Sequence, residues 1–342
     1  MGADSAAGPK RTGHRRRRSP GATIRQVAKA AGVSTATVSR VFSGAGGVRS
    51  TTRERVLNAA RDARYRPNPA ARSLARGSTG LLGIVVPDLT HPGEAHFVQA
   101  AMRRAQTEGF SLAVADWVHS PAEVRPLVAE MAQRTDGLLL CAPALLDREC
   151  AVLAETAAVV LARRRVRPLP TVLANERVRV LRAIEHLREL GHDRVAWVAP
   201  SNDSEVERER DTALSRPGGG PSVVALEAGG ASFADGHGLT NALLRSGATA
   251  AIAFEGELAP GLLSGLRDGG IDVPGRISLV GGDDRGDRRS GLTTVVSPLD
   301  EMGAAAVDLL LMTTRGETTA PALRTVRFDP RLEIRRSTGP PP

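Results

Sequence analysis

The sequence predicts a small all-α module at the N-terminus, followed by a larger α/β body built on parallel sheets. Between residues 23 and 64, apolar side chains recur at the spacing of helices that pack on one face. Beyond Gly80, short apolar runs alternate with amphipathic segments of helical period, as in a doubly wound sheet. A chain of 342 residues is long enough for such a module and a body of two lobes.

Positive charge is concentrated in the first fifth of the chain. Residues 1–76 contain 17 Lys and Arg but 3 Asp and Glu, a net charge of +14, whereas the whole chain carries +9. Cationic side chains that neutralise phosphates release counterions, which favours binding to polyanions. We expect residues 1–22, rich in Gly, Ser, Pro and Arg, to form a disordered basic tail. That tail either stays solvated or touches DNA phosphates or a minor groove.

Several classes of protein are excluded by the composition. No run of about 18 apolar residues can span a membrane, and the basic N-terminus lacks the apolar segment of a secretion signal, so a cytoplasmic location is expected. Cys141 and Cys150 lack metal or redox spacing, which predicts reduced, buried thiols. Seven scattered His and the absence of catalytic motifs predict that the protein is not an enzyme and uses no metal or cofactor.

Two short helices joined by a tight turn are predicted over residues 24–31 and 35–43. Thr23 followed by Gln26 has the spacing of a capping box, and Gly32 ends the first helix. The pair is therefore a candidate helix-turn-helix. The side chains expected to face inward are Ile24, Val27, Ala28, Ala31, Val38, Val41 and Phe42.

The outward face of the second predicted helix carries small side chains and one arginine: Thr35, Ala36, Ser39 and Arg40. In the major groove of DNA, Arg can contact guanine in a bidentate manner, Thr can form a hydrogen bond, and Ala leaves room for a thymine methyl group. A pair of ordinary surface helices is the alternative interpretation of this segment alone.

A third helix is predicted over residues 52–64, with Val56, Leu57 and Ala60 facing inward. After a Pro-rich joint, Asn68 can cap a further helix of one to two turns. Because a helix this short is not stable alone, we expect it to order only on a surface.

Nine strand candidates are separated by amphipathic segments in the body, more than one doubly wound domain usually contains. Ligands of such sheets bind beyond the carboxyl ends of the strands, so a cleft between two lobes is the natural small-molecule site. The candidates are LLGIVVPD, SLAVAD, GLLLCAP, AVVLAR, RVAWVAP, SVVALEAG, ATAAIAFE, ISLVGGDD and TTVVS.

Five stretches together carry a specific resemblance: ATIRQVAKAAGVSTATVSRVFSG, VRSTTRERVLNAARDARYRPNPAARSLARGSTGLLGIVVPDL, LRELGHDRVAWV, ISLVGGDD and LTTVVSPLDEMGAAAVDLL. Over about residues 22–336 the chain resembles the lactose-repressor (LacI/GalR) family of bacterial transcription regulators. The resemblance implies a helix-turn-helix DNA-binding domain at 23–67, a hinge helix and linker at 68–79, and a two-lobed, periplasmic-binding-protein-like body at 80–336.

The resemblance also implies how the body is divided. Lobe one is expected at about 80–174 and 297–322, and lobe two at about 175–296 and 323–336, with a tail at 337–342. The chain then crosses between the lobes near Asn175, Val296 and Leu323. Because of Pro217 and the three glycines that follow it, we expect a helix of lobe two to be cut short.

DNA-contacting roles follow from the resemblance, position by position. Leu74 matches a hinge-helix leucine that is wedged into the minor groove at the operator centre, where unstacking a base step costs a few kcal/mol that a bent duplex recovers. The matching base-reading positions are Thr35, Ala36 and Arg40. Those that support phosphate contacts are Thr23, Ser34, Thr37, Ser39 and Thr51.

Departures from the family pattern fall where its members commonly contact their effector. Two aromatic positions hold Gly93 and Glu94, an Asp-Arg pair reads Arg163-Arg164, and an Asn-Asp pair reads Glu255-Gly256. Arginines favour an anionic group, so a conventional neutral sugar is not expected. The candidate effector contacts are Glu94, Arg163, Arg164, Asn175, Arg208, Glu255, Asp283 and Asp284.

The resemblance thus implies a homodimeric repressor that binds a near-palindromic double-stranded DNA operator and responds to a small-molecule effector, anionic or otherwise unlike a sugar. No membrane partner is expected. The alternatives are a DNA-binding or DNA-bending protein that has lost its response to a ligand, and, on body architecture alone, a sugar-binding receptor. The basic head argues against the receptor.

Overall fold

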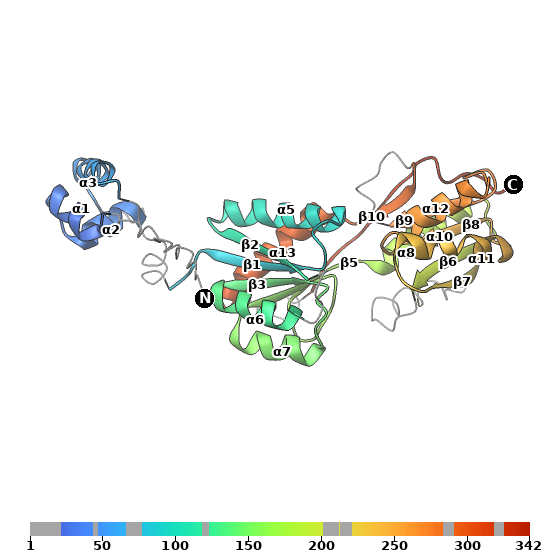
Figure 1. Cartoon of the computed structure of the whole chain (residues 1–342), viewed down its shortest axis with the longest axis horizontal. Helices are drawn as coiled ribbons and strands as arrows, with labels where there is room; N and C mark the ends of the chain where they lie inside the picture. Colours follow the sequence, from blue (N-terminus) through green and yellow to red (C-terminus); the bar gives the residue numbers. More distant parts are fainter. Residues whose placement is uncertain are drawn as a thin grey trace, which may run out of the picture. The chain divides into compact units, whose positions relative to one another are not determined.

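The computed structural model describes residues 22–43, 47–65, 77–117, 123–200, 212, 221–282, 291–317 and 325–342. By their contacts the residues form two units, the first ending at Thr79 and the second beginning at Gly80 (Figure 1). Leu74, Arg208, Asp283 and Asp284, to which the sequence assigned roles, lie outside the described residues. So do residues 1–21 of the basic tail.

In the described part of the first unit, three helices pack together: α1 (Ile24–Ala31), α2 (Thr35–Ser43) and α3 (Ser50–Asp62). The predicted capping box is present, because the Thr23 amide donates to Gln26 Oε1 at 2.7 Å and the Gln26 amide donates to Thr23 Oγ1 at 3.4 Å. Gly32 ends α1 with a φ of 62°, a conformation that glycine adopts without strain. The bounds predicted for the first two helices are confirmed.

A compact apolar core joins these helices, and Val27, Val38 and Val56 at its centre are fully buried. Leu57, expected to face inward, is instead 38% exposed. Val56 and Ala60 lie four residues apart on one face of α3, whereas Leu57 is rotated by about 100° from Val56. The ring of Tyr65 closes the core against Phe42, with ring centroids 5.7 Å apart.

Lobe one of the second unit is built on a parallel sheet in the order β11-β5-β4-β3-β1-β2. Helices α5 (Pro92–Thr107) and α13 (Leu299–Thr314) cover one face, and α6 (Val124–Arg134) and α7 (Asp147–Thr156) cover the other (Figure 1). The strands are β1 (Leu81–Val86), β2 (Ser111–Asp116), β3 (Gly137–Cys141), β4 (Val159–Ala162), β5 (Thr171–Ala174) and β11 (Thr325–Phe328).

Lobe two has a sheet in the order β12-β10-β9-β8-β6-β7, parallel except for the antiparallel pair of β10 and β12. Helix α8 (Glu176–Glu189) packs on one face, and α10 (Phe233–Gly238), α11 (Thr240–Arg245) and α12 (Leu258–Asp268) on the other. The strands are β6 (Arg194–Pro200), β7 (Ser222–Ala228), β8 (Ala250–Ala253), β9 (Ser278–Gly282), β10 (Thr293–Val296) and β12 (Arg331–Glu333).

The chain crosses between the lobes between β5 and α8, between β10 and α13, and between β11 and β12. The third crossing, expected near Leu323, follows Phe328 instead. Residues 325–328 pair with β5 and therefore belong to lobe one, not lobe two. The four-residue sequence Thr-Val-Arg-Phe is too short to predict a strand by itself, and only its pairing with β5 makes it one.

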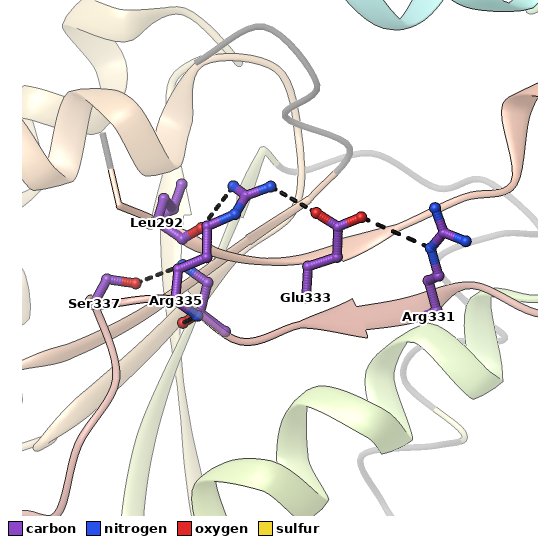
Figure 2. A network of polar contacts seen from close by, with 6 residues as sticks. Leu292, Arg331, Glu333, Arg335 and Ser337 are labelled. Atoms are coloured by element: carbon purple, nitrogen blue, oxygen red, sulfur yellow. Dashed lines mark hydrogen bonds and ion pairs between the residues drawn. The ribbon is translucent and has the colours of Figure 1, made fainter. Parts of the chain in front are cut away.

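The C-terminal residues, expected to form a tail after residue 336, are built into lobe two. Ser337 is 3% exposed, and its Oγ accepts from the Thr293 amide at 2.7 Å and donates to the Leu279 carbonyl oxygen at 2.6 Å. Figure 2 shows the strand that leads there: Glu333 lies between two arginines, 2.7 Å from Arg335 Nη2 and 3.7 Å from Arg331 Nε.

All nine strand candidates are confirmed, as β1 to β4 and β6 to β10, whereas β5, β11 and β12 were not predicted. Among the described residues, no helix combines the length and apolar character needed to cross a membrane.

Candidate functional sites

The outward face of α2 is the candidate DNA-reading surface. Thr35, Ala36, Ser39 and Arg40 are exposed, while Val38 on the packed face of the same helix is fully buried. Residues 22–65 contain eight Lys and Arg against two acidic residues, so the unit that presents this face is strongly positive. The geometry presents the three predicted base-reading side chains to solvent together.

Hydroxyl groups lie at the start of the head helices. Ser34 Oγ accepts from the Thr37 amide at 3.1 Å and thereby caps α2, and it lies 2.9 Å from Thr37 Oγ1. Thr23 caps α1, and the exposed Thr51 lies in the first turn of α3. Backbone amides at helix N-termini carry partial positive charge, which suits a phosphate.

At the C-terminal edge of the lobe-one sheet, Glu94 forms an ion pair with Arg163. Glu94 is the third residue of α5 and is 5% exposed, and Arg163 directly follows β4. Arg163 has a φ of 60°, a strained conformation that a non-glycine residue adopts only where its surroundings hold it. The sequence placed both residues at the effector site, and the structure brings them together.

Cys141, at the end of β3, lies beside this ion pair. Burial raises the pKa of its thiol, Arg163 lowers that pKa and Glu94 raises it. The thiol therefore stays protonated. Cys141 and Cys150 are both buried and free, as the prediction of reduced, buried thiols requires.

Arg164 has a structural role within lobe one. Its guanidinium donates to the carbonyl oxygens of Pro143 and Leu145 and forms an ion pair with Asp147 at 2.6 Å. These contacts hold the loop between β3 and α7. The charge of Arg164 is thus neutralised within lobe one.

Asn175 lies at the first crossing and caps α8. Its Oδ1 accepts from the Val178 amide at 3.4 Å, and its Nδ2 donates to Asp329 Oδ1 at 2.9 Å. Because both ends of this amide have partners within the protein, Asn175 organises the crossings in addition to any contact with a ligand.

Lobe two contributes Glu255, which is partly buried two residues beyond the end of β8. The next residue, Gly256, has a φ of 49°, and an added Cβ would overlap the Ala231 carbonyl oxygen. Hence no side chain fits at position 256, and Glu255 supplies the only side chain of this pair.

Sequence reasoning missed Arg179 and Phe254, which lie at this edge of lobe two. Arg179 is 8% exposed, and its guanidinium carbon lies 5.6 Å from the centre of the Phe254 ring. A surface helix rich in arginine gives no local signal that one of them is buried. In the described residues, no cluster of three or more His, Cys, Asp or Glu side chains could hold a metal ion.

The structure thus has a basic helix-turn-helix unit followed by a two-lobed body of largely parallel sheets. This is the architecture of a DNA-binding regulator. The model described as "Bacterial regulatory proteins, lacI family" matches residues 23–68, and that of a "Periplasmic binding protein-like domain" matches residues 184–338. The transcriptional regulator AscG of Escherichia coli is 31% identical over 275 residues, covering 77% of this chain and 82% of the relative. The chain belongs to the lacI family.

Two further comparisons span almost the whole chain. The regulator GalR of Escherichia coli is 29% identical over 333 residues, covering 94% of this chain and 96% of the relative. A structure of the lac repressor dimer bound to operator and the anti-inducer ONPF matches with a TM-score of 0.81 and 28% identity, over 94% of this chain and 100% of that one. The protein is therefore a DNA-binding transcription regulator and not an enzyme.

Proposed function

We propose that the protein is a dimeric repressor that binds a near-palindromic operator, each head occupying one half-site in the major groove. The observation that carries the proposal is the exposed face of α2, where Thr35, Ala36 and Arg40 can reach base edges without disturbing the core beneath. A two-fold dimer matches the symmetry of a palindrome. The operator-bound dimer of the lac repressor supports this assembly.

The hydroxyl groups of Thr23, Ser34, Thr37, Ser39 and Thr51 position each head through phosphate contacts, which carry no sequence information themselves. Leu74, as the minor-groove wedge of the hinge helix, sits at the operator centre and kinks it. The basic residues 1–22 add affinity through phosphates. These roles come from the family resemblance and, for Thr23, Ser34, Thr37 and Thr51, from the placement of the hydroxyl groups at helix starts.

The effector site lies at the C-terminal edges of the two sheets, with Glu94, Arg163, Asn175 and Glu255 as its described contacts and Arg208, Asp283 and Asp284 as its remaining members. Arg163 is neutralised by Glu94, and Arg164 by Asp147. The pair of Glu94 and Arg163 offers a carboxylate and a guanidinium side by side. An effector that bears both hydrogen-bond donors and acceptors therefore fits better than a strongly anionic one.

Selection of bound duplexes from random DNA tests this function. Full-length protein is expected to enrich one near-palindrome, and each metabolite of a panel of sugars, sugar phosphates and amino compounds is then scored for its effect on that binding. Arg40→Ala should relax base preference at one position of each half-site by about tenfold or more. Arg182→Met, an exposed arginine of lobe two, is the matched control. Failure to enrich any duplex over genomic competitor would refute the proposal.

A second candidate is a repressor that responds to no effector. The internal ion pair between Glu94 and Arg163 favours it, since each charge is already neutralised by the other where a ligand would bind. A selected operator whose affinity is unchanged by every metabolite of the panel would support this candidate.

A further inference from the structure

The first turn of α8 touches all three segments that connect the lobes. Asn175, the N-cap of this helix, belongs to the first crossing, and Arg179 lies one turn later. Each of these two residues contacts a different crossing. The start of α8 therefore lies at the three crossings, which are the segments that bend when one lobe moves against the other.

Asn175 joins the first crossing to the third. Its backbone amide donates to the Phe328 carbonyl oxygen at 2.8 Å, and its side-chain Nδ2 donates to Asp329 Oδ1 at 2.9 Å. Phe328 ends β11 in lobe one, and Asp329 lies between β11 and β12. The two chain segments are thus held side by side at the point where they leave lobe one.

Arg179 joins the first turn of α8 to the second crossing. Its Nη2 donates to Ser297 Oγ at 2.7 Å, and Ser297 directly follows β10 on the path to α13. Arg179 Nε lies 3.6 Å from Glu176 Oε2, which keeps a carboxylate near the buried guanidinium.

The guanidinium is also fixed in orientation. It lies over the Phe254 ring, which in turn packs edge-on against Trp197 with ring centroids 5.4 Å apart. A planar guanidinium that stacks on a ring and donates from its rim has far less freedom than a solvated arginine. Arg179 is 8% exposed and Ser297 is 1% exposed, so water does not compete for this contact.

We propose that Arg179 is a positioning residue of the hinge: by holding Ser297, it couples the second crossing to the first turn of α8, and through Asn175 to the first and third crossings. The three connections then bend together and not independently. The inference rests on the proposed function in one respect, namely that movement of the lobes controls the DNA-binding head. It concerns which bending motions the three crossings allow, whichever ligand drives the lobe movement.

Hydrogen exchange of the full-length protein, without DNA or effector, tests the inference. Arg179→Met keeps the length of the side chain and its contact with the Phe254 ring but removes the donor to Ser297. Arg179→Lys keeps the charge but not the planar fork. Arg182→Met, an exposed arginine of the same helix, is the matched control.

For Arg179→Met, amides in the segments 171–180, 293–299 and 325–333 should exchange about tenfold faster, since a lost contact to a charged group lowers the local opening free energy. Amides of β3 and of β8, in the sheet interiors, should keep their rates. Arg179→Lys should fall in between, and Arg182→Met should match the parent protein.

Ser297→Ala tests the route of the coupling. If the contact between Arg179 and Ser297 carries it, the double variant should exchange no faster at the crossings than Arg179→Met alone. Faster exchange spread evenly through lobe two would mean that Arg179 only stabilises that lobe, and the inference would be overturned. Unchanged exchange at 293–299 would overturn it as well. Because no DNA is present, either failure leaves the proposed regulator function standing.

Discussion

Replacement of Ser337 by Ala should destabilise lobe two by about 2–4 kcal/mol. Ser337 Oγ lies between two backbone groups, accepting from the Thr293 amide at 2.7 Å and donating to the Leu279 carbonyl oxygen at 2.6 Å. With the residue 3% exposed, water cannot replace the hydroxyl. Each buried backbone group left without a partner costs about 1–3 kcal/mol, and relaxation of the strand ends recovers part of the sum.

The unfolding of lobe two can be followed by the fluorescence of Trp197, which is 8% exposed on β6. A Trp117→Phe background removes the other tryptophan of the chain, and urea titration then reports the free energy of unfolding of this lobe. Ser222→Ala, at an exposed serine that begins β7 in the same sheet, is the control and should change that free energy by less than about 0.5 kcal/mol. A loss for Ser337→Ala no larger than that of the control would refute the assignment of the C-terminal segment to the structure of lobe two.

Three further outcomes are expected. Gly261→Ala should lower the stability of lobe two by about 1–3 kcal/mol in the same titration, because an added Cβ would overlap the Phe233 carbonyl oxygen of α10, and a variant as stable as the parent would contradict this close packing. Burial lowers the pKa of His186 and of His192 below the ordinary value of 6.5, so the unfolded chain binds protons more readily. Stability should be full above pH 6.5 and decline as the pH falls below it, and His192→Gln should flatten that decline; a decline as steep as that of the parent would point to other groups. Leu74→Ala should weaken binding to the selected operator in a gel-shift assay by about tenfold or more while leaving urea unfolding of lobe two unchanged, and unaltered binding would dismiss the wedge.

Local signals in the sequence determined the head. The capping box of Thr23 and Gln26, the left-handed Gly32 and the helical spacing of Val38 and Val41 act within a few residues of one another. Such signals do not depend on the rest of the chain, so both helices of the candidate recognition motif were predicted with their observed bounds. The exposure of Thr35, Ala36 and Arg40 follows from the same periodicity.

Long apolar runs likewise determined nine of the strands, because a strand buried on both faces is apolar along its whole length. Short strands escaped this reasoning. Residues 325–328 became a strand of lobe one only by pairing with β5, and residues 331–333 became one by pairing with β10. The partner, not the run itself, supplied the hydrogen bonds.

Tertiary structure alone decided how the charged residues of the body are used. Glu94 and Arg163 lie 69 residues apart in sequence, and Arg179 and Ser297 lie 118 apart, so no local pattern could pair them. A buried charge needs an opposite charge or a hydrogen-bond partner, and folding brings that partner from a distant segment. The sequence by itself determined the two head helices, nine of the strands, the basic head and the family. Contacts between distant segments at the ends of the two sheets decided that Arg163 and Arg164 are neutralised and that Arg179 holds the crossings.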